Sequence, residues 1–135
     1  MNKITYGLEY NGIKQRFAQS VVVGDLVFVS GSSGRTIETG EVSSNKIRDQ
    51  IKVALDKVRG ALERAGSSMN QIVKVVIYLK DMRDYEEVKQ AEWDYWTEFA
   101  PALIKDPPAS TVVQVVSLSK PSMLIEIDIT AIKAT

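Results

Sequence analysis

The chain of 135 residues contains no cysteine and no histidine. The absence of cysteine excludes disulfides, thiolate nucleophiles and zinc sites with sulfur ligands. The absence of histidine excludes a Ser-His-Asp triad, an imidazole general base and histidine-ligated metals. Any catalysis by this chain must therefore use carboxylates, lysine, tyrosine, serine or backbone amides, and no metal or cofactor is expected.

Neither sign of charge is in excess, because 17 Lys and Arg residues balance 17 Asp and Glu residues. Strong generic attraction to nucleic acid or to an anionic membrane is therefore not expected. No apolar run approaches the roughly 18 residues of a membrane span. The N-terminus lacks a secretory apolar segment, so a cytoplasmic protein is expected.

Alternating and β-branched segments predict the strands. Residues 3–10 alternate apolar and polar side chains, and Asn11-Gly12 after them is a strong hairpin signal. Gly24-Asp25 is expected to form a turn, because glycine adopts positive φ without a Cβ clash. Residues 30–44 are rich in Gly, Ser and Thr, and are expected either to form a plain surface loop or to surround a ligand. The other strands are expected at residues 21–23, 26–29, 72–79, 111–117 and 122–132.

Two segments have the spacing of amphipathic helices. In residues 45–65, apolar side chains recur at intervals of three and four, and Ser44 or Asn45 is expected to cap the helix start. A capping-box pattern at Asp84 opens a second helical stretch, residues 85–99.

The order of these elements is strands, helix, strand, helix, strands, and both helices are long enough to cover one face of a sheet. This order predicts an α+β fold, a two-layer sandwich in which a mixed sheet of about six strands carries two helices on one face. With 44% hydrophobic and 25% charged residues, the composition is that of a globular protein. Since no linker or internal repeat interrupts it, residues 1–135 are expected to form a single domain.

Glu126 and Asp128 are the best candidates for chemistry from pattern alone. They alternate with apolar residues in the last strand, so both carboxylates are expected on one face, roughly 7 Å apart. That face is either an ordinary solvated surface or one that neighbouring subunits cover. Coverage would raise the pKa of a carboxyl by desolvation and give it acid/base capacity.

The segment from Pro107 to Thr111 is a second candidate. Two prolines stiffen the chain, and the hydroxyls of Ser110 and Thr111 lie where a strand is expected to begin. This segment is either a simple strand entry or an edge whose amide and hydroxyl donors receive a carboxylate or carbonyl oxygen.

Several motifs along nearly the whole chain resemble the RidA family, also called YjgF or L-PSP. The resemblance implies a subunit similar in fold to bacterial chorismate mutase, assembled as a homotrimer with a ligand cleft at each subunit interface. It also implies an enamine/imine deaminase, which adds water to a reactive imine and releases a 2-oxo acid and ammonia. The motifs are GDLVFVSG at 24–31, TGEV at 39–42, AGSSMNQIVKVVIYLKDMRDY at 65–85, PPASTVVQV at 107–115 and MLIEIDITA at 123–131.

The resemblance implies roles for individual residues. Glu126 matches the glutamate that orients the attacking water, and Ser30 and Gly31 match the pair that ends the buried strand. Phe17 stands where deaminases carry a tyrosine, so one hydroxyl is missing. Lys89 stands where they carry an asparagine.

The deaminase motif P-A-R-[ST] reads Pro108-Ala109-Ser110-Thr111 in this chain, so Ser110 replaces the arginine that pairs with the substrate carboxylate. A charge-assisted pair of this kind contributes about 1.5–3 kcal/mol to binding. Either the ligand is not an amino-acid-derived imine, or another cation, Lys89 or Arg35, takes over.

Three functions remain open on this evidence. The first is hydrolysis of a small imine, enamine or related carbonyl compound, with Glu126 positioning water and Ser110 and Thr111 binding the polar end of the substrate. The second is a non-catalytic module that binds a small metabolite in the clefts. The third is an interaction role for Trp93 and Trp96, which are otherwise packing residues of the second helix.

Overall fold

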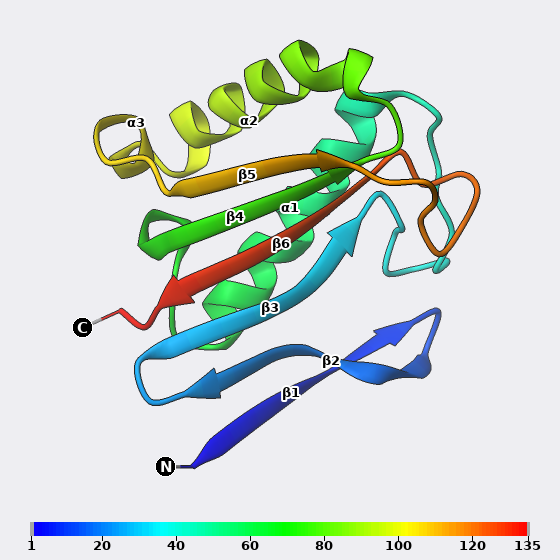
Figure 1. The fold of residues 1–135 in the computed structure, drawn as a ribbon. Coiled ribbons are helices and arrows are strands. Elements are labelled where there is room, and N and C mark those ends of the chain that lie inside the picture. The colour runs from blue at the N-terminus through cyan, green and yellow to red at the C-terminus, as the bar shows by residue number, and fades with distance from the viewer. Residues whose placement is uncertain (1, 135) are drawn as a thin grey trace.

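The computed structural model of the protein describes residues 2–134, in which a six-stranded sheet carries two long helices on one face (Figure 1). The strand order is β1-β2-β3-β6-β4-β5. Only β4 and β5 are parallel neighbours within this part of the chain, and the other pairs are antiparallel. The expected α+β fold is therefore confirmed. The strands are β1 (Lys3–Tyr10), β2 (Ile13–Val23), β3 (Leu26–Ser33), β4 (Ile72–Leu79), β5 (Ala109–Gln114) and β6 (Ile125–Ile132).

The helices follow the predicted periodicity. The long helices are α1 (Ile47–Arg64) and α2 (Tyr85–Phe99), and the short helix α3 (Ala102–Lys105) follows α2. The 3-10 turns η1 (Met69–Gln71) and η2 (Met82–Asp84) precede β4 and α2, respectively. Among residues 2–134, no helix combines the length and the apolar character that crossing a membrane requires.

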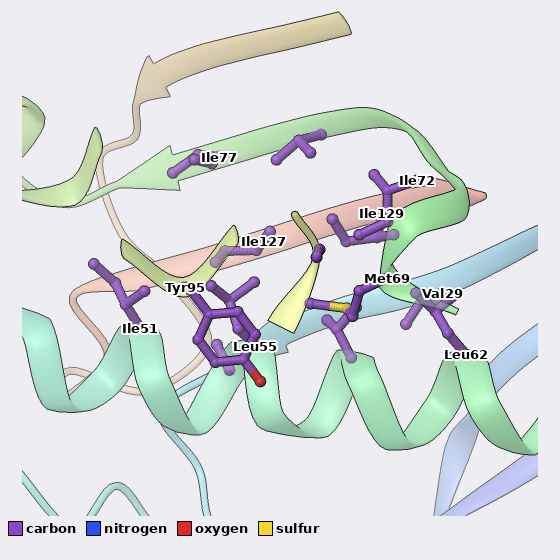
Figure 2. Close-up of a cluster of buried hydrophobic side chains, with 14 of the residues drawn as sticks. Val29, Ile51, Leu55, Leu62, Met69, Ile72, Ile77, Tyr95, Ile127 and Ile129 are labelled. Atoms are coloured by element: carbon purple, nitrogen blue, oxygen red, sulfur yellow. The ribbon is translucent and has the colours of Figure 1, made fainter. Parts of the chain in front are cut away.

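The core lies between α1 and the sheet (Figure 2). One stripe of α1, including Ile51, Leu55 and Leu62, packs against alternate residues of β6, among them Ile127 and Ile129. Each of these side chains is at most 2% exposed. Because side chains alternate along a strand, burying these residues turns Glu126 and Asp128 toward the face that carries no helix.

The two predicted turns are present. Asn11 and Gly12 both have positive φ, 51° and 73°, as a type I′ hairpin turn requires. Gly24, with φ of 59°, forms the turn between β2 and β3.

Some expected element ends are wrong. Ser30 does not open a loop, because β3 continues to Ser33 by pairing with β6. Neither Ser44 nor Asn45 is the N-cap of α1, because Lys46 occupies that position. Asp84 occupies the N-cap position of α2 as expected, but its side chain accepts no capping hydrogen bond. The Asp81 carboxylate instead accepts the backbone N–H of Arg83, which caps the 3-10 turn before α2.

The face of the sheet without helices carries exposed apolar side chains. Leu26 and Phe28 of β3 are 41% and 44% exposed, and Ile132 of β6 is 39% exposed. The β3–β6 register pairs Leu26 with Ile132, so these side chains share that face. We call it the open face.

Candidate functional site

A β-bulge in β3 brings the backbone against Glu126. Val29 pairs with Ile129 and Ser32 pairs with Ile127, so β3 carries one extra residue in this interval. Gly31 lies in the bulge, and a Cβ built there would be 2.8 Å from Cδ of Glu126. Only glycine fits this approach without displacing the carboxylate.

The Glu126 carboxylate lies in a pocket that also contains three of the residues expected from the sequence, Phe17, Ser30 and Gly31. The pocket has a volume of about 360 Å³, which is room for a small metabolite. We call it the Glu126 pocket. It is lined by Tyr10, Phe17, Ser30, Gly31, Ser33, Arg35, Ser119, Met123, Glu126 and Asp128.

Burial raises the pKa of Glu126, and the neighbouring charge of Asp128 raises it further, whereas the positive charge of Lys57 lowers it. Within residues 2–134, no hydrogen bond to the Glu126 carboxyl is among the causes that shift its pKa. Asp128 differs, because the Tyr78 hydroxyl donates to its Oδ2 at 3.1 Å. Both oxygens of the Glu126 carboxylate are therefore available to water or to a ligand, whereas Oδ2 of Asp128 is already engaged.

A tyrosine and two cations that the sequence did not place together lie beside the Glu126 pocket. The Arg35 guanidinium lies 4.0 Å from the centroid of the Tyr10 ring, and its Nε donates to the Gly40 carbonyl at 2.8 Å. From α1, Lys57 Nζ donates to the Tyr10 hydroxyl at 2.8 Å. Burial and the nearby charge of Arg35 lower the pKa of Lys57 to about 8.

Two of the expected pocket residues contribute little hydrogen bonding to a ligand. The Ser30 hydroxyl donates to the Ala18 carbonyl within β2, so its proton is already engaged. Phe17 is 46% exposed and brings an apolar ring to the pocket.

Ser110 and Lys89 lie in a different pocket, between α2 and the edge strand β5. Lys89 Nζ lies 3.5 Å from Ser110 Oγ and 2.7 Å from Oε1 of Glu92. We call this the Ser110 pocket. It is lined by Glu86, Lys89, Gln90, Glu92, Trp93, Trp96, Pro107, Pro108 and Ser110.

Thr111 points the opposite way from Ser110. The parallel β4–β5 register pairs Ser110 with Val75, which faces the helices, and Thr111 with Val76. Lys74 Nζ donates to the Thr111 hydroxyl at 3.1 Å. The residues expected to form one site thus occupy three places within a single chain: the Glu126 pocket, the Ser110 pocket and the edge of the open face.

Comparison with known proteins assigns the family. The chain matches the family described as Endoribonuclease L-PSP over residues 11–133. The chain belongs to the RidA family. It is 34% identical over 117 residues to a RutC family protein of Pyrococcus abyssi, which covers 87% of this chain and 86% of that protein.

Two comparisons within the RidA family involve Escherichia coli proteins. The chain is 30% identical over 117 residues to the 2-iminobutanoate/2-iminopropanoate deaminase of strain K12, covering 87% of each. The crystal structure of E. coli TdcF with bound serine has a TM-score of 0.84 at 26% identity, covering 98% of this chain and 100% of that chain.

The RidA resemblance of the sequence motifs is therefore confirmed, and so is the fold that it implied. What sequence reasoning missed is the pair Tyr10 and Lys57. Each has an ordinary place in its own element, and 47 residues separate them. No local pattern signals such a pairing.

Proposed function

We propose that this RidA family member hydrolyses a small imine or enamine to a carbonyl compound and ammonia, with Glu126 positioning the attacking water. The observation that carries the proposal is the placement of Glu126, a half-buried carboxylate at the backbone of the Gly31 bulge. The deaminase name of the E. coli relative supports the same chemistry.

The reaction needs no group beyond a carboxylate and water. Glu126 accepts a proton from water while the water oxygen bonds to the imine carbon, the C=N electron pair passes to nitrogen, and Glu126 gives that proton to the nitrogen. In the resulting carbinolamine, Glu126 accepts the hydroxyl proton as the C=O group forms and the C–N bond breaks. The departing nitrogen takes this proton from Glu126 and leaves as ammonia. The raised pKa of Glu126 suits a group that both accepts and returns a proton.

We further propose that the protein is a homotrimer, acts in the cytoplasm, and forms each complete site from two subunits. The Glu126 pocket includes residues of the open face, whose apolar side chains need a cover. The Ser110 pocket includes the edge strand β5, which a neighbouring subunit can reach. A neighbour seated on the open face would bring its Ser110 and Lys89 to the Glu126 pocket.

The test measures how fast the protein consumes an imine that is generated in situ. Semicarbazide in the same solution traps the remaining imine as a semicarbazone, and the amount of semicarbazone is the readout. The wild-type protein is expected to reduce semicarbazone formation, and Glu126→Gln to lower that activity at least a hundredfold, since it removes the proton acceptor. Glu63→Gln, on the exposed surface of α1, is the matched control and is expected to retain full activity. Full activity of Glu126→Gln would contradict the proposal.

A second function, metabolite binding without turnover, is favoured by Phe17, which brings no hydroxyl to the pocket. It predicts that a ligand raises the melting temperature while no imine is consumed. The ribonuclease activity in the family description gains no support from this chain, which has no histidine and no excess positive charge.

A further inference from the structure

Arg35 is the only cation that lines the Glu126 pocket within residues 2–134. Its guanidinium lies 4.0 Å from the centroid of the Tyr10 ring, and its Nε donates to the Gly40 carbonyl at 2.8 Å. In this part of the chain no carboxylate forms an ion pair with Arg35, and its Nη1 and Nη2 donate to no protein group. The edge of the guanidinium that suits both oxygens of a carboxylate is therefore free.

The turn after Arg35 holds this arrangement. The backbone N–H of Gly40 donates to the Thr36 carbonyl at 2.7 Å, and that of Thr36 donates to the Glu41 carbonyl at 2.9 Å. Gly40 has a φ of 74°, and a Cβ there would lie 3.1 Å from Cβ of Tyr10. Because the turn and the ring fix the guanidinium before a ligand arrives, binding costs little additional side-chain entropy.

A second positive charge lies on the same tyrosine. Lys57 Nζ donates to the Tyr10 hydroxyl at 2.8 Å and forms no ion pair within residues 2–134. The charge of Arg35 lowers the pKa of Lys57 more than the charge of Glu126 raises it. The two cations therefore repel each other across a neutral ring, and an anion bound at Arg35 would relieve that repulsion.

The other cation that the sequence offered, Lys89, is already compensated. Its Nζ lies 2.7 Å from Oε1 of Glu92, and the two side chains are 30% and 10% exposed. Because this pair is largely shielded from solvent, its attraction is less screened than that of a surface ion pair. A ligand anion beside Ser110 would have to compete with Glu92 for Lys89, whereas an anion beside Arg35 has no competitor.

We infer that Arg35 binds the carboxylate of the substrate. The carboxylate site then belongs to the same subunit as Glu126, and not to β5 of a neighbour, where Ser110 stands. Arg35 and Glu126 line one pocket of about 360 Å³ and form no ion pair with each other, so a small ligand fits between them. This inference rests on the proposed function, because it assigns the end of the substrate opposite the attacking water.

The first test compares two ligands of nearly the same shape that differ in charge, phenylpyruvate and its methyl ester. By calorimetry, the wild-type protein is expected to bind phenylpyruvate at least tenfold more tightly, the range of a charge-assisted pair. Arg35→Met is expected to abolish this preference by weakening phenylpyruvate alone. Arg48→Met, which removes an arginine already paired with Glu87 and Asp94, is the control and should keep the preference. Equal affinities in the wild type, or an unchanged preference in Arg35→Met, would overturn the inference.

Two further variants keep the test decisive if Arg35→Met does not fold. Arg35→Gln removes the charge but retains an amide that can donate to the Gly40 carbonyl, and it should also abolish the preference. Lys89→Met should leave the preference unchanged. Retention of the preference by Arg35→Gln, or its loss in Lys89→Met, contradicts the inference.

Proton uptake distinguishes direct binding at Arg35 from a merely structural role. The groups around Lys57 are Tyr10 of β1, Arg35 after β3 and Glu126 of β6, with Glu38 and Asp56 at the neighbouring surface pocket. Since the pKa of Lys57 is about 8, a carboxylate that offsets the Arg35 charge should make the protein take up a fraction of a proton at pH 8. Calorimetry of phenylpyruvate in two buffers of different ionisation enthalpy measures this uptake, which Lys57→Met should lose. Binding to the wild type without uptake would overturn the inference.

A kinetic comparison separates failure of the inference from failure of the proposed function. An amino-acid oxidase produces the imine of phenylalanine in situ, and a flavin amine oxidase produces the imine of 2-phenylethylamine, which has no carboxylate. Arg35→Gln is expected to lower kcat/KM at least tenfold for the first imine and less than twofold for the second. Equal losses contradict the inference. Absence of turnover with both imines in the wild type contradicts the proposed function, and the preference for phenylpyruvate and its loss in Arg35→Gln then still decide the role of Arg35.

Discussion

Gly31 is the residue at which the backbone comes closest to the Glu126 carboxylate. A Cβ at this position would lie 2.8 Å from Cδ and 3.1 Å from Oε1 of Glu126. Gly31→Ala is therefore expected to displace the carboxylate and lower kcat/KM for imine hydrolysis at least tenfold. Because a side chain and not the backbone must move, the free energy of unfolding should fall by only about 1 kcal/mol.

Gly60 provides the matched control for Gly31. A Cβ at Gly60, within α1, would meet nothing within 4 Å, so Gly60→Ala is expected to stabilise the protein by about 0.4–1 kcal/mol. Urea unfolding and the imine assay on both variants check these values. Retention of full activity by Gly31→Ala would show that the close approach to Glu126 has no catalytic role.

Lys57 tunes Glu126 from the other side of the sheet. Its positive charge lowers the pKa of Glu126, which burial and Asp128 raise. Lys57→Met is expected to move the acid limb of the kcat/KM profile to higher pH, because Glu126 must lose its proton to accept one from water. Lys57→Arg keeps the charge and should leave that limb in place. A pH profile with the same acid limb for all three proteins contradicts this electrostatic role.

The stability of the protein should also respond to Lys57 at high pH. The pKa of Lys57 is about 8 in the folded protein, compared with an ordinary value of 10.5. Between these values the unfolded chain binds more protons, so this group makes the folded state more stable as the pH rises. The free energy of unfolding of the wild type, relative to Lys57→Met, is expected to increase from pH 8 to pH 10.5 in urea titrations.

At the scale of elements, the Gln50 side chain of α1 is hydrogen-bonded to the backbone just before β6. Gln50 is 1% exposed; its Nε2 donates to the carbonyls of Ser44 and Ser122, and its Oε1 accepts the Leu124 N–H. The distances are 2.8, 3.0 and 2.8 Å. The chain just before Glu126 is thereby fixed to the helix.

Gln50→Leu removes these three part-buried hydrogen bonds and leaves the backbone groups of Ser44, Ser122 and Leu124 without this partner. The free energy of unfolding is expected to fall by about 2–4 kcal/mol, measured by urea denaturation. Gln15→Leu is the control, since within residues 2–134 its amide donates only to the nearby Ile13 carbonyl, and it should change stability by less than about 0.5 kcal/mol. Similar effects of both substitutions would refute this role of Gln50.

Local sequence pattern predicted the helices and strands better than it predicted where each of them ends. The apolar stripe of α1 predicted the helix well, because each turn repeats the same burial against the sheet. The extension of β3 through Ser30 to Ser33 was not predicted, since glycine and serine carry little strand propensity. The pairing of β3 with β6 outweighs that weak local preference.

At the scale of the whole molecule, the open face predicts assembly. Phe28 is 44% exposed on that face, so Phe28→Lys is expected to place a charge in the subunit interface and reduce the mass measured by light scattering from trimer toward monomer. Activity should fall with it, because each proposed site needs two subunits. Ile37→Lys changes a residue of similar exposure, 37%, at a pocket beside α1, and should remain trimeric. An unchanged mass for Phe28→Lys would contradict the proposed interface.

The sequence by itself determined the elements, the α+β class and the family, because periodicity, turn residues and motifs are local properties of the chain. It also excluded thiol and imidazole chemistry and placed Glu126 and Asp128 on one face. The tertiary structure alone decided which polar groups meet. The β3 bulge set Gly31 against Glu126, packing brought Lys57 to Tyr10, and the β4–β5 register turned Ser110 toward Lys89 and Thr111 away from it. These contacts depend on packing and register between elements distant in sequence, which no single segment encodes.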